Sequence, residues 1–117
     1  MQTSRLFHFA DANLASSLAG GDFHGLAPPS LETEGFVHLS FAAQLAGTLD
    51  VHFAKASAVL LIEIEPTGLG EALRLEPSRD DALFPHLYRP LLASDVKRWW
   101  RLSNDGSGWQ LPEEVLS

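Results

Sequence analysis

The stretch AVLLIEIE, residues 58–65, carries the clearest β-strand pattern in the chain. It begins as a continuous apolar run and ends in alternation, which is typical of a central strand with one end in solvent. Pro66 then ends the strand, because proline has no backbone N–H to donate to a sheet ladder. We therefore predict a central, buried strand over residues 59–64.

Shorter strand patterns lie on both sides of this stretch. Proline within the run 83–88 predicts an edge strand or a bulge there, because Pro85 interrupts a ladder. The turn-rich residues 103–108 predict a hairpin between 96–102 and 109–111. The predicted strands are RLFHF (5–9), FVHL (36–39), ALRLE (72–76), LFPHLY (83–88) and VKRWWRL (96–102).

Two segments favour helices, both in the N-terminal half. Residues 12–18 are rich in Ala and Leu, follow Asp11 as an N-cap and stop before the glycine pair at 20–21. Ser40 is a candidate N-cap for a second helix, over residues 40–54. This second segment has a stripe at helical spacing, formed by Phe41, Leu45, Leu49, His52 and Phe53. The pattern as a whole predicts an α+β fold with two principal helices.

Length and composition narrow the class of protein. The 117 residues predict one domain over residues 1–117, and a formal net charge of −7 argues against nucleic-acid binding. The chain has no cysteine, which excludes disulfides and thiolate chemistry and agrees with a reducing cytosol. Residues 1–5 lead into no apolar signal segment, and no apolar run approaches the roughly 20 residues of a membrane helix. We expect a cytoplasmic protein with a small-molecule ligand.

Three histidines lie in separate predicted strands among apolar neighbours: His8, His38 and His86. A half-buried imidazole needs a hydrogen-bond partner, and leaving one unpaired costs roughly 1–3 kcal/mol. Either each histidine is satisfied alone as a structural residue, or all three share a cleft as ligand-binding or acid/base groups. We predict that they converge on one concave surface, with Ser40 and Tyr88 beside them. Ser40 has an alternative role as the cap of the following helix.

Strand carboxylates form the second group of candidates. Glu63 shares a strand face with Glu65, and Glu76 shares one with Arg74, because side chains alternate along a strand. Such acids are solvated, ion-paired between strands or catalytic, and the sequence does not decide between these three roles. The polar residues 78–81 read as a solvated turn.

A metal site is a further alternative. The three histidines and a glutamate would suit zinc or iron, since imidazole and carboxylate are ligands of both. No pair in the chain has a diagnostic ligand spacing such as H-E-x-x-H.

A series of motifs in fixed order resembles a known bacterial family. The motifs are LFHF (6–9), GFVHLS (35–40), Gln44, VLLIEIEPTGLG (59–70), LRLEP (73–77) and LFPHLY (83–88). Together they resemble the family called domain of unknown function 952, over roughly residues 5–96. Arg89 departs from the family pattern, which commonly has Gly after the Tyr, and residues 97–117 are covered only in part.

That resemblance implies an ADP-ribosyltransferase-like fold, with a split, strongly twisted sheet that holds NAD or an ADP-ribose-like group. A more distant similarity to NAD-dependent RNA 2′-phosphotransferases matches His8 to a histidine that contacts the dinucleotide. It also matches His38 and Ser40 to the second-strand motif. Phe9-Ala10 replaces a Gly-Thr pair, and residues 34–36 lack the expected arginine and histidine. The phosphotransferase reaction itself is therefore not expected.

Three functional hypotheses remain. The first is an enzyme that handles NAD or ADP-ribose, which needs hydrogen-bond donors, an aromatic wall and a carboxylate near the developing positive charge. The second is a non-catalytic small-ligand or interaction module, and the third is a metal-dependent enzyme. A carboxylate within reach of the histidines would favour the first over the second. Under the first hypothesis His8, Phe36, Ser40 and Tyr88 bind the ligand, and His38, His86 and Glu76 are catalytic, with Glu63 as the alternative carboxylate.

Overall fold

The computed structural model describes residues 5–116. The prediction that residues 1–5 lead into no signal segment therefore concerns four residues outside the described part of the chain. Its strands are β1 (Leu6–Ala10), β2 (Gly25–Leu26), β3 (Val37–His38), β4 (Ser40–Phe41), β5 (Ala58–Ile64), β6 (Leu73–Pro77), β7 (Leu83–Leu87), β8 (Leu91–Leu92) and β9 (Val96–Ser103). Its α-helices are α1 (Ala15–Gly20), α2 (Pro29–Thr33), α3 (Leu45–His52) and α4 (Glu113–Leu116). Short 3₁₀ turns span Ala12–Leu14, Ala42–Gln44, Pro66–Gly68, Gly70–Ala72, Arg79–Asp81 and Ala93–Asp95.

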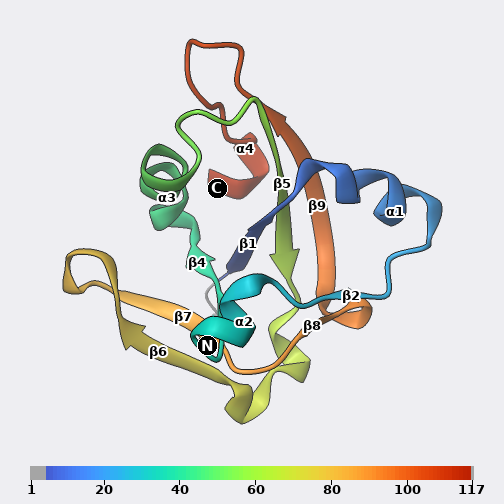
Figure 1. Ribbon diagram of the computed structural model, residues 1–117, viewed down its shortest axis with the longest axis vertical. Coiled ribbons are helices and arrows are strands. Elements are labelled where there is room, and N and C mark those ends of the chain that lie inside the picture. Colours follow the sequence, from blue (N-terminus) through green and yellow to red (C-terminus); the bar gives the residue numbers. More distant parts are fainter. Residues whose placement is uncertain (1–4, 117) are drawn as a thin grey trace.

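Strand β5 lies at the centre of an antiparallel four-stranded sheet of order β4-β1-β5-β9 (Figure 1). Leu60 and Ile62 have no exposed surface and pack in one hydrophobic cluster with Leu6 and Val37. Leu61 points the other way, into a second cluster that includes Phe7, Phe9, Leu45 and Leu49. The prediction of a central, buried strand over residues 59–64 is confirmed.

A second sheet has the order β3-β7-β6, so the LFPHLY strand is central and the edge prediction for it was wrong. The carbonyl of Pro85 accepts from the Leu39 N–H at 3.0 Å. In an antiparallel strand the N and the C=O of one residue face the same neighbour. The position of the missing Pro85 N–H therefore faces β3 and not β6. Strand β3 pairs with β7 only at Val37 and His38, and the pairing of β7 with β6 loses no hydrogen bond.

The shortest connection between the two sheets is a single residue. Strand β3 pairs with β7 of the second sheet, whereas β4 pairs with β1 of the first. Leu39 alone separates β3 from β4, and its side chain is buried between the sheets' core residues. The chain therefore changes sheets at Leu39, between His38 and Ser40.

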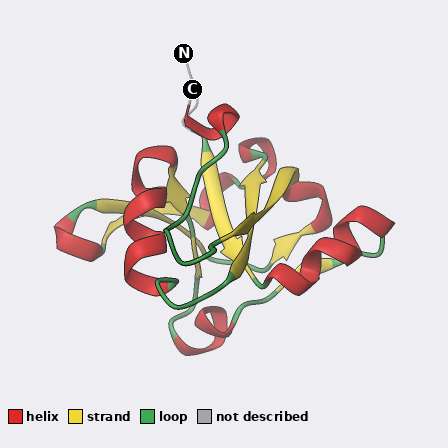
Figure 2. Cartoon of the chain, turned by 90° about the horizontal axis from the view of Figure 1, so that it is seen from above, coloured by secondary structure: helices red, strands yellow, loops and turns green. Residues whose placement is uncertain are grey.

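The helices lie around the outside of the strands (Figure 2). The first predicted helix begins as a 3₁₀ turn that Asp11 caps, with its carboxylate accepting from the Asn13 N–H at 2.9 Å. Gly21 ends α1 in the left-handed region, at φ 79°. The architecture is therefore a mixed α+β fold with several antiparallel sheets. Within residues 5–116 no helix is long and apolar enough to cross a membrane.

Two local predictions need correction. Ser40 belongs to β4 and caps no helix, because the helical segment begins one residue later, with Phe41 at the N-cap position and its N–H donating to the Gln44 side chain at 2.9 Å. Residues 109–111 form no return strand, since one bridge between Asn104 and Trp109 is the pairing there. The Asn104 side chain accepts from turn amides, and the Trp109 indole donates to the Phe53 carbonyl at 3.2 Å. These side-chain hydrogen bonds, and not a hairpin ladder, fix the conformation of the turn.

Candidate functional site

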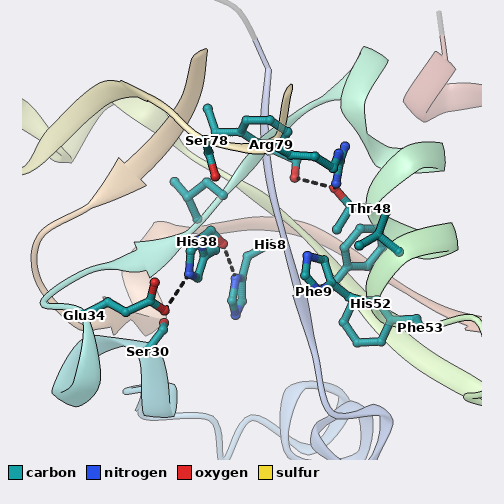
Figure 3. Close-up of a pocket in the computed structure, with 14 residues that line it drawn as sticks. His8, Phe9, Ser30, Glu34, His38, Thr48, His52, Phe53, Ser78 and Arg79 are labelled. Atoms are coloured by element: carbon teal, nitrogen blue, oxygen red, sulfur yellow. Dashed lines mark hydrogen bonds and ion pairs between the residues drawn. The ribbon is translucent and has the colours of Figure 1, made fainter. Parts of the chain in front are cut away.

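A cleft of about 620 Å³ lies between β1, the β3–β4 segment, α3 and the turn that follows β6 (Figure 3). The side of α3 that carries Thr48 faces the cleft, and Phe9 and Phe53 supply apolar wall. The polar side chains that line it include His8, Glu34, His38, Ser40, Thr48 and Arg79. The cleft thus combines imidazole, hydroxyl, carboxylate and guanidinium groups.

His8 enters the cleft from β1 and is only 8% exposed. Its Nδ1 lies 2.8 Å from the backbone carbonyl of His38. A carbonyl can only accept, so Nδ1 carries the hydrogen and donates. Burial lowers the pKa of His8 below its usual 6.5, despite the bond to His38. His8 is therefore neutral at pH 7, with Nε2 left as a hydrogen-bond acceptor that has no partner among residues 5–116.

His38 lies at the rim of the cleft, with 48% of its side chain exposed. Its Nε2 is 2.9 Å from the Glu34 carboxylate. Glu34 follows α2, and Gly35 in the left-handed region at φ 91° turns the chain back so that Glu34 meets His38. We did not predict Glu34 as a site residue. Its place directly before this glycine and four residues before His38 was the available signal.

The turn after β6 also contributes to the cleft. We predicted a solvated turn over 78–81, which holds for Asp80 and Asp81 but not for Arg79. Arg79 is half-buried, and its Nη1 donates to the Thr48 hydroxyl at 3.2 Å. Ser78 lines the same part of the cleft. The turn therefore presents a cation to the cleft, which the local sequence pattern did not indicate.

A second group of candidate residues lies next to His38, on the face of the β3-β7-β6 sheet. His86 is directly opposite His38 in the ladder, with ring centroids 5.5 Å apart. The Phe36 ring stacks on His86 at 4.0 Å and meets His38 edge-on at 4.9 Å. The Glu76 carboxylate accepts from His86 Nδ1 at 2.9 Å and from the Tyr88 hydroxyl at 2.5 Å. We call Phe36, Glu76, His86 and Tyr88 the sheet-face cluster.

Hydrogen bonding sets the charge state of this cluster. The Tyr88 hydroxyl, followed by His86, lowers the pKa of Glu76 below its usual value, and Glu76 raises the pKa of Tyr88. Glu76 is therefore ionised and Tyr88 protonated at neutral pH. His86 is 4% exposed, and its Nε2 is buried without a hydrogen-bond partner among the described residues. The cluster thus holds an oriented imidazole with one unused nitrogen.

The predicted site residues are therefore brought together in two adjoining places. His8, His38 and Ser40 line the cleft. The four residues of the sheet-face cluster contact one another next to His38 but do not belong to the cleft lining. Within the described residues, no three His, Asp or Glu side chains are grouped so that they would hold a metal ion.

Glu63, the alternative carboxylate, is in neither place. It is 1% exposed and lies between two guanidinium groups. Arg5 binds it through Nε at 2.8 Å and Nη2 at 3.0 Å, and Arg98 Nη2 lies at 2.9 Å. Glu63 is therefore an ion-paired structural residue.

Solved structures of the protein CC0527 from Caulobacter crescentus are similar to this chain. Its crystal structure is 34% identical, covers 97% of this chain and 100% of its own, and superposes with a TM-score of 0.78. Its solution NMR structure is 32% identical over 92% of this chain and 91% of its own, with a TM-score of 0.71. A search of curated proteins found no match.

The sequence also matches a protein-family model described as "Protein of unknown function (DUF952)", over residues 9–99. The match includes β3, β5 and β7, which carry His38, Glu63 and His86. It therefore spans the sheet-face cluster and every residue of the cleft lining except His8, and the chain belongs to the DUF952 family.

Proposed function

We propose that the cleft binds a small ligand of the NAD or ADP-ribose type. The observation that carries the proposal is the neutral His8, whose unpaired Nε2 accepts a hydrogen bond in a cleft of about 620 Å³. That volume lies in the range of roughly 300–1,000 Å³ typical of small-molecule sites. A ribose hydroxyl would donate to His8 Nε2, while Ser40 and Phe9 would offer a hydroxyl and an apolar wall.

The ADP-ribosyltransferase-like fold implied by the motifs is part of this proposal. Two antiparallel sheets joined at Leu39, with the cleft beside the junction, support such a split-sheet arrangement. The acidic net charge of −7 favours a small molecule over a nucleic acid as the ligand. A cytoplasmic location and a single domain stay predictions from the sequence.

A second candidate function is ADP-ribosyl transfer, favoured by the carboxylate of Glu34 beside His38. In such a reaction the bond between ribose C1′ and the nicotinamide nitrogen breaks. Nicotinamide leaves with the electron pair, and an acceptor nucleophile bonds to C1′ as its proton passes to a base. Glu34 would stabilise the positive charge on the ribose, and His38 would take the proton. The Glu76–His86 pair would then act through the ring contact with His38, as a positioning group.

Calorimetry of the purified chain with NAD, ADP-ribose and nicotinamide tests the binding proposal. We expect ADP-ribose and NAD to bind, and His38→Ala to abolish binding while the fold is retained. His24→Ala is the matched control, because His24 is exposed and outside the cleft lining. If none of the three compounds binds at millimolar concentration, the proposal fails.

Release of nicotinamide from NAD separates the two candidate functions. An enzyme would release nicotinamide over time, and Glu34→Gln would slow the release more than it weakens NAD binding. Binding without release would identify the chain as a non-catalytic ligand-binding module.

A further inference from the structure

The guanidinium of Arg79 is fixed by uncharged neighbours. Nη1 donates to the Thr48 hydroxyl at 3.2 Å, and Nη2 lies 3.5 Å from the Gln44 carbonyl. The cation also lies over the Phe84 ring, 4.9 Å from its centroid. These contacts hold the group against α3 at the wall of the cleft, as Figure 3 shows for Arg79 and Thr48.

Arg79 differs from the other half-buried arginines in having no carboxylate partner. Arg5 is paired with Glu63, and Arg89 is paired with Asp95 at 2.7 Å. Among residues 5–116 no ion pair includes Arg79, in a chain of net charge −7. A guanidinium has five N–H donors, of which the contacts with Thr48 and Gln44 use two. Both charge and donors therefore remain for a ligand.

Helix α3 is shaped to receive this cation. A Cβ on Gly47 would lie 2.9 Å from Arg79 Nη2, closer than real Cβ contacts allow. Glycine weakens the interior of a helix, because it loses more conformational freedom on folding than other residues. Gly47 has no positive φ that would require glycine, and a side chain there would take the room that the Arg79 guanidinium occupies.

Hydroxyl groups complete the surroundings of the cation. Because Thr48 Oγ1 accepts from Arg79, the Thr48 hydroxyl hydrogen stays available to donate. Ser40 Oγ lies 3.5 Å from Thr48 Oγ1, and Ser78 lines the same region. A fixed guanidinium with neighbouring hydroxyl donors is the arrangement that binds phosphate oxygens.

We infer that Arg79 and Thr48 form the subsite for a phosphate group of the cleft ligand. This inference rests on the proposed function, since it places the charged part of the ligand that the cleft binds. It makes Arg79 a specificity-determining residue, which selects phosphate-bearing ligands over neutral ones of the same size.

Calorimetry on the full chain with ADP-ribose, ribose 5-phosphate, inorganic phosphate and ribose tests the subsite. Arg79→Gln should weaken binding of ADP-ribose and ribose 5-phosphate by about 10- to 100-fold, the loss expected for hydrogen bonds to a charged group. Arg79→Lys should recover part of it, because lysine keeps the charge but not the planar donors. Ribose affinity should not change. Lys97→Gln, an exposed site on β9, removes the same charge and should stay within two-fold of the wild type.

A second variant distinguishes a loss of binding at the subsite from a loss of folding caused by the substitution of Arg79. Gly47→Ala pushes the guanidinium away with the cation retained, and it should weaken the phosphate ligands selectively. If Arg79→Gln and Gly47→Ala bind ADP-ribose as tightly as the wild type, the subsite is wrong while the proposed function stands. If inorganic phosphate alone reproduces the Arg79 dependence, the subsite stands and the ligand is any phosphate. If the wild type binds none of the probes, the proposed function and the subsite both fail.

Discussion

Glu63 and Glu76 are both strand glutamates, yet their surroundings differ completely. Glu63, in the four-stranded sheet, is 1% exposed and lies between the guanidinium groups of Arg5 and Arg98. The Glu76 side chain, in the three-stranded sheet, is 34% exposed and accepts from His86 and Tyr88. Two cations bind the first carboxylate directly, whereas the second accepts hydrogen bonds from a tyrosine and a histidine, and Arg74 acts on it at longer range. An acid of the first kind serves folding, and one of the second kind stays available for chemistry.

The direction of the pKa shift does not separate the two acids. Hydrogen bonding by Arg5 lowers the pKa of Glu63, even though burial opposes it. Tyr88, then His86, lowers the pKa of Glu76. Both are ionised at neutral pH, so the identity of the partners, and not the shift, marks the functional candidate.

Removal of the Glu63 charge should give the largest effect on stability. Glu63→Gln leaves two cations side by side at a buried position, and we expect the free energy of unfolding to fall by about 3 kcal/mol, the lower end for a broken buried pair. The lower end applies because Arg98 retains 46% side-chain exposure. Urea denaturation measures the change. Glu76→Gln should change stability far less, and a larger loss for Glu76 than for Glu63 would reverse the comparison.

The pH dependence of stability should separate the contributions of His8 and Glu63, two buried groups of the four-stranded sheet. The pKa of His8 is lowered in the folded state, so the unfolded state binds more protons, and stability falls as the pH drops below about 6.5. The pKa of Glu63 is also lowered, so its stabilisation is present above about 4.5 and is lost as the pH falls through the folded value.

Thermal denaturation between pH 8 and pH 3 would follow both losses. His8→Gln should flatten the profile between pH 7 and pH 5 and leave the decline below pH 4.5. Glu63→Gln should do the opposite. A profile for His8→Gln that keeps the wild-type slope near pH 6 would contradict a neutral, buried His8.

His86 offers a sharper test of the sheet-face cluster. His86→Phe removes the unpartnered Nε2 and keeps a ring against Phe36. It also removes the Nδ1 bond to Glu76, but that carboxylate is 34% exposed and keeps the Tyr88 hydroxyl as a donor. We therefore expect stability to be unchanged or higher by up to about 1 kcal/mol. Ligand binding or nicotinamide release should decline if the cluster orients His38. Chemical denaturation and calorimetry give the two readouts. A loss of more than about 2 kcal/mol with normal binding would make His86 a structural residue.

The smallest effect on stability is expected for His38→Ala. The His38 ring is exposed at the rim, and its pair with Glu34 is of the exposed kind that contributes little. The free energy of unfolding should change by no more than about 0.5 kcal/mol, while ligand binding is lost. If His38→Ala lowered stability as much as ligand binding, His38 would be a structural residue and not a binding residue.

Local pattern was sufficient for β5 and for the strands that carry the three histidines. The apolar run at 58–62 favours burial on both faces of the strand, so the central position of β5 was predictable. The contact between Arg79 and α3 was not predictable, because strand pairing between segments far apart in the sequence brings the turn after β6 against α3. The glycine at 47, inside an amphipathic helix, was the one local sign of that contact. The edge-strand prediction from Pro85 was wrong for a related reason. Its missing N–H costs the sheet no hydrogen bond only because β3 ends beside it.

The single-residue junction at Leu39 has a mechanical consequence. It is the shortest covalent connection between the two sheets, so a relative rotation of the sheets must be absorbed by the backbone torsions of residues 38–40. The side chains on either side of this pivot, His38 and Ser40, line the cleft. A molecule held by both would lock the pivot, and amide hydrogen exchange would then slow in β4 and β7 together, although they belong to different sheets.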